Sequence, residues 1–85
     1  MNKIRRDIDK IDEKIFKLLK TRLTKAKKIA ALKKYMKVQT NDDEREQEIL
    51  KKLDCEDYRP YQKQMTEIYK EIFKQMKDLE YGENE

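Results

Sequence analysis

Two cations stand among apolar side chains in the N-terminal half of the chain, and their spacing suits the binding of an anion. Arg22 and Lys33 are 11 residues apart, which is three helical turns, so on a helix their directions differ by only ~20°. Their Cα atoms would be roughly 16 Å apart. If the two long side chains reach toward each other, the gap between them has the size of a small dianion. Arg5 lies near the edge of the same face, toward its far end.

Further ionisable residues fall on faces that a helix would bury. The segment NDDEREQEIL, residues 41–50, carries three of them at helical spacing from Ile49 and Leu50. These three residues are Asp42, Arg45 and Glu46. The C-terminal segment adds Met76 and, one turn later, Glu80 at the end of its apolar stripe. Every predicted helix therefore has ionisable groups on its apolar side.

Structural explanations stay open for each residue taken singly. Long cations can extend from an apolar seam to water, and polar residues in a seam can set register or partner number. Asp42 with Arg45, or Arg22 with Glu46, would form structural ion pairs. The set as a whole favours a ligand, because an isolated buried charge costs several kcal/mol unless it is paired. A bound dianion would balance a pocket rich in Arg and Lys.

The residue types that the chain lacks narrow the chemistry. It has no Ser, no His, one Cys and one Gly. Serine triads and histidine bases are therefore excluded, as are the usual zinc sites and glycine-rich phosphate loops. Carboxylates, lysines and arginines remain, so we expect electrostatic chemistry with no cofactor and no metal.

Length and charge set further limits. A chain of 85 residues is expected to form one domain, residues 1–85. Its net charge of +4, from 22 Lys and Arg against 18 Asp and Glu, suits a small anionic ligand or an acidic partner. Basic residues are spread along the chain, so we do not expect nucleic-acid binding.

The lone Cys55 excludes a disulfide within the chain. The N-terminus MNKIRRDIDK lacks the apolar core of a signal peptide. No run approaches the roughly 20 apolar residues of a membrane span. We therefore expect a cytoplasmic protein with no membrane segment.

The residues from about 3 to 36 are predicted to form one helix, whose apolar stripe recurs at three- and four-residue steps. The stripe consists of Ile4, Ile8, Ile11, Ile15, Leu18, Ala26 and Ile29. Such a helix is roughly 50 Å long, whereas a compact chain of this size has a radius of gyration near ~12 Å. We expect a partner chain to cover the stripe, and a second copy of the same chain is the simplest choice. In an antiparallel dimer, Arg5 would approach the partner's Arg22 and Lys33.

Two shorter helices are predicted to follow. Asn41 can cap the second, with Glu44 completing a capping box, and that helix covers residues from about 42 to 53. A third helix covers residues from about 60 to 80, with Pro60 in its first turn. Residues 81–85 are predicted to be a frayed tail. The fold class is all-α.

The pattern resembles a known enzyme family. IRRDIDKIDEKIFKLLKTR, KIAALKK and NDDEREQEIL, from residue 4 to about residue 53, closely resemble the all-helical class of chorismate mutases. IYKEIFKQMKDLE, residues 68–80, resembles the third helix of that class. The resemblance implies three helices per chain, one long and two shorter, and two chains intertwined in a homodimer. It also implies the pericyclic rearrangement of chorismate to prephenate, a step toward phenylalanine and tyrosine.

The resemblance implies a role for each residue of the first two helices. Arg5 would reach from the partner chain to a carboxylate of the substrate, and Arg22 would bind a carboxylate from within its own chain. Lys33 would serve both a carboxylate and the ether oxygen. From the second helix, Asp42 and Glu46 would hold the ring hydroxyl, and Arg45 would complete the cationic wall.

The third helix departs from the family pattern. Met76 stands where a small polar residue is common, and a thioether cannot donate a hydrogen bond. Glu80 stands where Gln is frequent, and only a protonated carboxyl donates. Activity is therefore expected to fall as pH rises, and Glu80→Gln to flatten the profile. With Arg22 and Lys33, Glu80 makes up the expected catalytic set.

Three other functions stay open at the level of sequence. An isochorismate-pyruvate lyase on the same scaffold needs a similar cationic pocket. A non-catalytic helical dimer that binds an acidic partner would show no turnover. The third is a chorismate mutase of feeble activity, which the replacement at Met76 keeps open.

Overall fold

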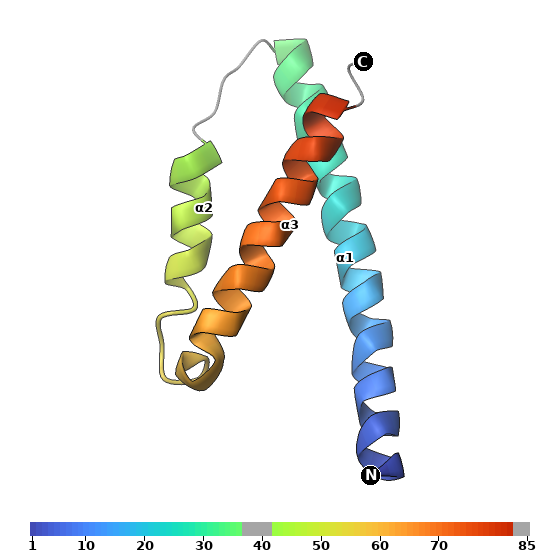
Figure 1. The fold of residues 1–85 in the computed structure, drawn as a ribbon. Coiled ribbons are helices and arrows are strands. Elements are labelled where there is room, and N and C mark those ends of the chain that lie inside the picture. The colour runs from blue at the N-terminus through green and yellow to red at the C-terminus, as the bar shows by residue number, and fades with distance from the viewer. Residues whose placement is uncertain (37–41, 83–85) are drawn as a thin grey trace.

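The structure, a computed structural model, describes residues 1–36 and 42–82, and for residues 80–82 the backbone alone. Within these residues the chain forms α1 (Asn2–Met36), α2 (Asp42–Lys51), a single 3-10 turn η1 (Arg59–Tyr61) and α3 (Gln62–Gly82), with no strand (Figure 1). The prediction of an all-α chain with one long and two shorter helices is confirmed. The homodimer stays a prediction.

The helix ends differ from the predicted ones by about one turn or less. α2 ends at Lys51, because the next two residues form tight turns. The N–H of Lys52 donates to the carbonyl of Ile49 at 3.1 Å, and the N–H of Leu53 donates to the carbonyl of Leu50 at 3.0 Å. These turns direct Leu53 inward, where it is buried. The predicted cap at Asn41 lies outside the described residues.

The third helix begins with the η1 turn that contains Pro60, and regular α-helix follows from Gln62. A proline is tolerated there because the first turn of a helix has no use for its missing N–H. At the other end, the backbone of residues 81 and 82 continues α3, although both were predicted to belong to a tail. The rest of that predicted tail, residues 83–85, lies outside the described residues.

The chain is elongated, as the length of its first helix requires. No Gly or Pro interrupts residues 2–36, so the backbone hydrogen bonds run on without a break. The molecule measures 51 × 25 × 16 Å and has a radius of gyration of 15.7 Å, above the ~12 Å of a compact chain of this length. Figure 1 shows the N-terminal part of α1 running beyond the other helices. No helix in the described part of the chain is both long and apolar enough to cross a membrane.

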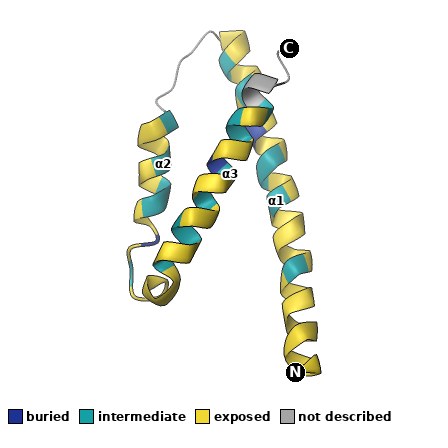
Figure 2. Cartoon of the chain, in the orientation of Figure 1, coloured by how far each residue is buried: buried dark blue, intermediate teal, exposed yellow. Residues whose placement is uncertain are grey.

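The small core forms where α3 crosses the C-terminal half of α1 and where the chain turns after α2. Its buried residues are Ala26, Leu53 and Phe73 (Figure 2). Ala26 is only 2% exposed, and a side chain this small allows two helices to approach closely. Phe73 is buried near the middle of α3, with the ring of Tyr69 tilted against it at 5.7 Å between centroids. This crossing fixes the face of α1 that carries Arg22 and Lys33.

Within the described residues, the N-terminal half of α1 has no comparable cover. Its stripe residues are exposed by 45–70%. They are Ile4, Ile8, Ile11, Ile15 and Leu18. Figure 2 shows almost all of this segment in the colour of exposed residues. The apolar stripe of α1 therefore extends several turns toward the N-terminus beyond the part that α3 covers.

Candidate active site

A cavity of about 330 Å³ lies among α1, α2 and α3. Its size is within the range of small-molecule sites. Six of the eight site residues predicted from the sequence line it: Arg22, Lys33, Asp42, Arg45, Glu46 and Met76. Apolar residues of the helix crossing form the rest of the wall, among them Ala26, Ile29 and Phe73. The cavity thus has the apolar body and converging charges of a ligand site.

Arg22 is the most unusual group in the cavity. Its Nε is buried and has no hydrogen-bond partner, and among the described contacts its guanidinium has no carboxylate partner. The guanidinium carbon instead lies 5.4 Å from the ring centre of Tyr69, a cation–π contact. A buried donor without a partner is costly to leave unsatisfied, so Arg22 is prepared to receive an anionic acceptor.

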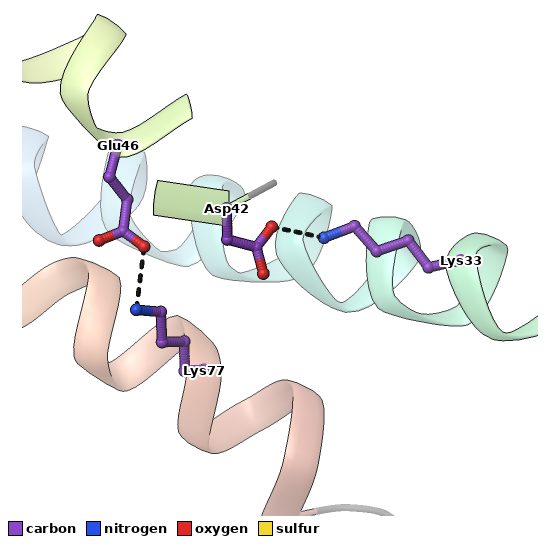
Figure 3. Close-up of polar contacts among 4 residues, drawn as sticks. All are labelled: Lys33, Asp42, Glu46 and Lys77. Carbon is purple, nitrogen blue, oxygen red and sulfur yellow. Dashed lines mark hydrogen bonds and ion pairs between the residues drawn. The ribbon is translucent and has the colours of Figure 1, made fainter. Parts of the chain in front are cut away.

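Lys33 and Asp42 form an ion pair at one end of the cavity. Lys33 Nζ donates to Asp42 Oδ1 at 2.8 Å, and both side chains are partly buried (Figure 3). The contact joins the last turn of α1 to the first turn of α2. The sequence had left open a pair of Asp42 with Arg45, and the structure gives Asp42 the lysine of the preceding helix instead.

Glu46 pairs with a residue that the sequence reading missed. Lys77 Nζ of α3 lies 3.0 Å from Glu46 Oε2 (Figure 3), so the alternative pair of Arg22 with Glu46 is not formed. The hydrogen bond to Glu46 raises the pKa of Lys77, and the charges of Glu46, Asp43 and Asp42 act in the same direction, while desolvation opposes them. Lys77 also lines the cavity.

One signal could have identified Lys77. It lies one turn after Phe73, so it shares a helix face with a core residue. A lysine at such a position usually extends to water, and the apolar period alone does not show that a carboxylate lies opposite. The pairing depends on the register of α2 against α3, which the sequence does not fix.

Arg45 and Met76 lie at the margin of the charged set. Arg45 is largely exposed and reaches Glu48 on its own helix at 3.3 Å, yet it also lines the cavity. Met76 is half-buried and contributes apolar wall, as its thioether cannot donate a hydrogen bond.

The ionisable groups that line the cavity do not balance. Among the residues whose side chains the structure describes, four cations line the cavity, Arg22, Lys33, Arg45 and Lys77, against the two carboxylates of Asp42 and Glu46. The two lysines are already paired with the two carboxylates, so the surplus among the lining groups lies on the two guanidiniums, of which Arg45 also reaches Glu48 outside the cavity. Guanidinium groups bind carboxylates with two parallel hydrogen bonds, and a ligand with two carboxylates would match the surplus.

Two predicted site residues are not brought to this cavity by the described structure. Arg5 is exposed near the start of α1 and does not line it. Glu80 belongs to α3, but its side chain lies outside the described part of the structure. The cavity of the single chain therefore contains two of the three groups predicted from α1, the three predicted from α2 and one of the two predicted from α3.

A second cavity, of about 460 Å³, adjoins the first and shares Arg22, Arg45 and Ile49 with it. Its other lining residues come from the end of α2, the following turn and the first half of α3: Lys52, Leu53, Tyr58, Met65, Ile68 and Tyr69. Ile68 is 61% exposed. Apolar surface therefore continues from the first cavity toward solvent on the side of the α2–α3 turn.

Among protein families, the one described as chorismate mutase type II matches residues 4–81. The match covers nearly the whole chain and all three α-helices except the outermost residues of α1 and α3. No curated protein and no solved structure gives a significant match.

Proposed function

Because the chain belongs to the chorismate mutase type II family, we propose that it converts chorismate to prephenate, in the route toward phenylalanine and tyrosine. The observation that carries this proposal is the cavity lined by the guanidiniums of Arg22 and Arg45, because the buried Nε of Arg22 has no hydrogen-bond partner among the described residues. Chorismate has two carboxylates, so its charge complements that surplus.

The reaction asks for orientation and electrostatics. It is an intramolecular rearrangement in which one bond breaks as another forms, with no nucleophile and no proton transfer. A chain without His or Ser can supply this chemistry. Gripping the substrate by its carboxylates holds it in the compact geometry that reacts, and Arg22 is the proposed internal grip.

Lys33 is proposed to act on the ether oxygen, which gains negative charge as its bond to carbon breaks. A cation already in place there stabilises the transition state more than the ground state. Removing such a donor typically costs about 3 kcal/mol, or roughly a hundredfold in rate. The contact with Asp42 at 2.8 Å supports this role, because it holds the ammonium at the cavity wall before a substrate arrives.

The carboxylates of α2 are proposed to accept the ring hydroxyl. Asp42 and Glu46 each face the cavity and each has a lysine partner. A carboxylate that accepts from a lysine through one oxygen keeps lone pairs free to accept from a hydroxyl group. Arg45 is proposed to complete the cationic wall from its exposed position.

The site is proposed to be completed by a second copy of the chain. The stripe of α1 from Ile4 to Leu18 is uncovered, and full burial of one Ile or Leu side chain contributes about 1.5–3 kcal/mol. An antiparallel partner would cover this stripe, and the second cavity offers it apolar surface beside Arg22. Arg5 of the partner would then reach the substrate, which agrees with its absence from the cavity of its own chain.

Glu80 is proposed as the second donor to the ether oxygen, with Met76 beside it as apolar wall. This role requires a protonated carboxyl. Turnover should therefore decline between pH 5 and 8, and Glu80→Gln should remove the decline because an amide donates at any pH. A wild-type profile that is flat over this range would exclude the role.

The direct test is to incubate the protein with chorismate and, separately, with isochorismate, and to identify the products. The proposal predicts that chorismate is consumed and prephenate appears, and that Arg22→Ala removes at least a hundredfold of this activity. Release of pyruvate from isochorismate in place of prephenate formation would assign the lyase activity. No consumption of either compound would leave the non-catalytic dimer.

A further inference from the structure

α2 carries three residues of the proposed site but has little of its own to hold it in place. It is 10 residues long and none of its residues is buried. Helices this short are marginal in water unless tertiary contacts fix them. Leu53, just beyond its C-terminal end, is buried and anchors that end. The orientation of its inner face must therefore depend on other contacts.

Two lysine–carboxylate pairs supply those contacts, one to each neighbouring helix. Lys33 of α1 holds Asp42, and Lys77 of α3 holds Glu46, four residues along the same face (Figure 3). The two pairs differ in one respect. Lys33 has a proposed role on the substrate itself, whereas the proposed reaction assigns none to Lys77.

The geometry at Glu46 leaves one oxygen available. Among the described contacts, Lys77 is the partner of Glu46, through Oε2, and Figure 3 shows the other carboxylate oxygen directed away from Lys77. The Glu46 side chain is 21% exposed and lines the cavity. A carboxylate held in this way presents one oxygen as an acceptor.

The charge of Lys77 matters as well. An unpaired carboxylate in the cavity would repel a ligand that carries two negative charges, and more strongly at partial burial than in water. Paired with Lys77, Glu46 can accept a hydrogen bond without that penalty. The other charged groups nearby are Asp42, Asp43 and Arg45 on α2, with Arg22 and Lys33 on α1.

We propose that Lys77 is a positioning residue that acts through Glu46: it fixes the inner face of α2 against α3, neutralises Glu46 and directs its free oxygen toward the hydroxyl of the bound ligand. The inference rests on the proposed function for the identity of that ligand, chorismate. It adds to the site a residue that contacts no substrate atom and yet sets the geometry of one that does.

A double-mutant cycle measured with chorismate tests the proposal. Lys77→Met should lower kcat/KM about tenfold, the effect of weakening one hydrogen bond to a charged group, while Lys77→Arg retains most of the activity. Combined with Glu46→Gln, the Lys77→Met change should have less than about a twofold further effect, because its target is gone. Lys74→Met removes an exposed lysine of the same helix and should change nothing.

Two results would overturn the inference. One is a Lys77→Met variant within twofold of wild type. The other is an equal loss in the wild-type and Glu46→Gln backgrounds, since Lys77 would then act by a route other than Glu46. Circular dichroism of each variant establishes that it folds.

A measurement without substrate tests the role of Lys77 independently of the proposed reaction. It also does not depend on whether the Lys77→Met variant folds. The ammonium of Lys77 is titrated by NMR in the wild type and in Glu46→Gln. Its pKa should be lower in the variant, because the partner that raises it has lost its charge. If the pKa of Lys77 is lower in Glu46→Gln but the wild type does not convert chorismate, only the proposed reaction is refuted. If the pKa of Lys77 is the same in both proteins, the ion pair with Glu46 is refuted.

Discussion

The two halves of α1 have the same apolar period but opposite surroundings. In the C-terminal half, Ala26 is 2% exposed beneath α3 and Lys33 is held by Asp42. In the N-terminal half, Ile4 is 63% exposed and Ile8 49%, and Arg5 lies on the open surface. The same apolar stripe is therefore covered at its C-terminal end and exposed at its N-terminal end.

The difference teaches that helical periodicity shows which face will be buried and leaves open which chain buries it. Burying apolar surface is the main favourable term in folding and association, so the uncovered half of α1 is the strongest argument for a second copy. The chemistry follows the same division, because the covered half contributes Arg22 and Lys33 to a cavity and the uncovered half holds a cation with no cavity of its own.

The largest effect is expected from placing a charge in the uncovered half. If a partner covers this stripe, Ile8→Glu buries an unpaired carboxylate in each copy at a cost of several kcal/mol. The dimer should dissociate and activity should fall below detection, since Arg5 is then no longer delivered. Sedimentation equilibrium and the chorismate assay measure the two outcomes.

Lys10→Glu is the matched control for this change. Lys10 is also exposed but lies off the apolar stripe, so the variant should keep the mass and activity of the wild type. If Ile8→Glu behaves like Lys10→Glu, the two halves of α1 do not differ in the way we infer.

A smaller but still large effect is expected in the covered half. Lys33→Ala should reduce turnover by roughly a hundredfold while circular dichroism shows unchanged helix content, because Ala favours the helix. Lys28→Ala, an exposed position on the same helix, should have no effect. Unfolding of Lys33→Ala in place of a loss of turnover would make Lys33 a structural residue.

The smallest effect concerns the stability of the covered part at high pH. The folded-state pKa of Lys77 is raised above its ordinary value of 10.5, so the folded state binds this proton more tightly than the unfolded state does. The stabilisation is complete below that value and is lost as pH rises through the folded-state pKa. Because Lys77 is 42% exposed, solvent screens the pair, and the contribution is about 0.2–1 kcal/mol.

Urea denaturation of wild type and Lys77→Met at pH 8 and above pH 11 measures this contribution. The wild type should be the more stable at pH 8, and the difference should shrink above pH 11. A difference that grows with pH would reverse the sign of the linkage.

The fold was largely predictable because its determinants are local. The bounds of α1 follow from an unbroken period with no Gly or Pro, and the elongated shape follows from the length of that helix. The end of α2 was less predictable, because two tight turns and the burial of Leu53 ended the helix before its apolar period did.

Six of the eight residues predicted for the candidate site line one cavity, whereas the partners of these residues were less predictable. The spacing of Arg22 and Lys33 along α1 predicted a common cavity, which both residues line. The partners of Asp42 and Glu46 depend on how α2 docks against α1 and α3, and the sequence does not encode that register in any local pattern. Lys77 was missed for this reason, since a lone lysine on a helix resembles every other solvated lysine.

The most direct test of the account is complementation between two inactive variants, Arg5→Ala and Arg22→Ala, mixed after unfolding and refolded together. In a two-fold dimer with Arg5 supplied across the interface, each mixed dimer has one intact site and one doubly damaged site. Random pairing gives about half mixed dimers, so the mixture should recover about a quarter of wild-type activity, although neither variant alone is active. A refolded mixture as inactive as its components would contradict the claim that two chains build one site.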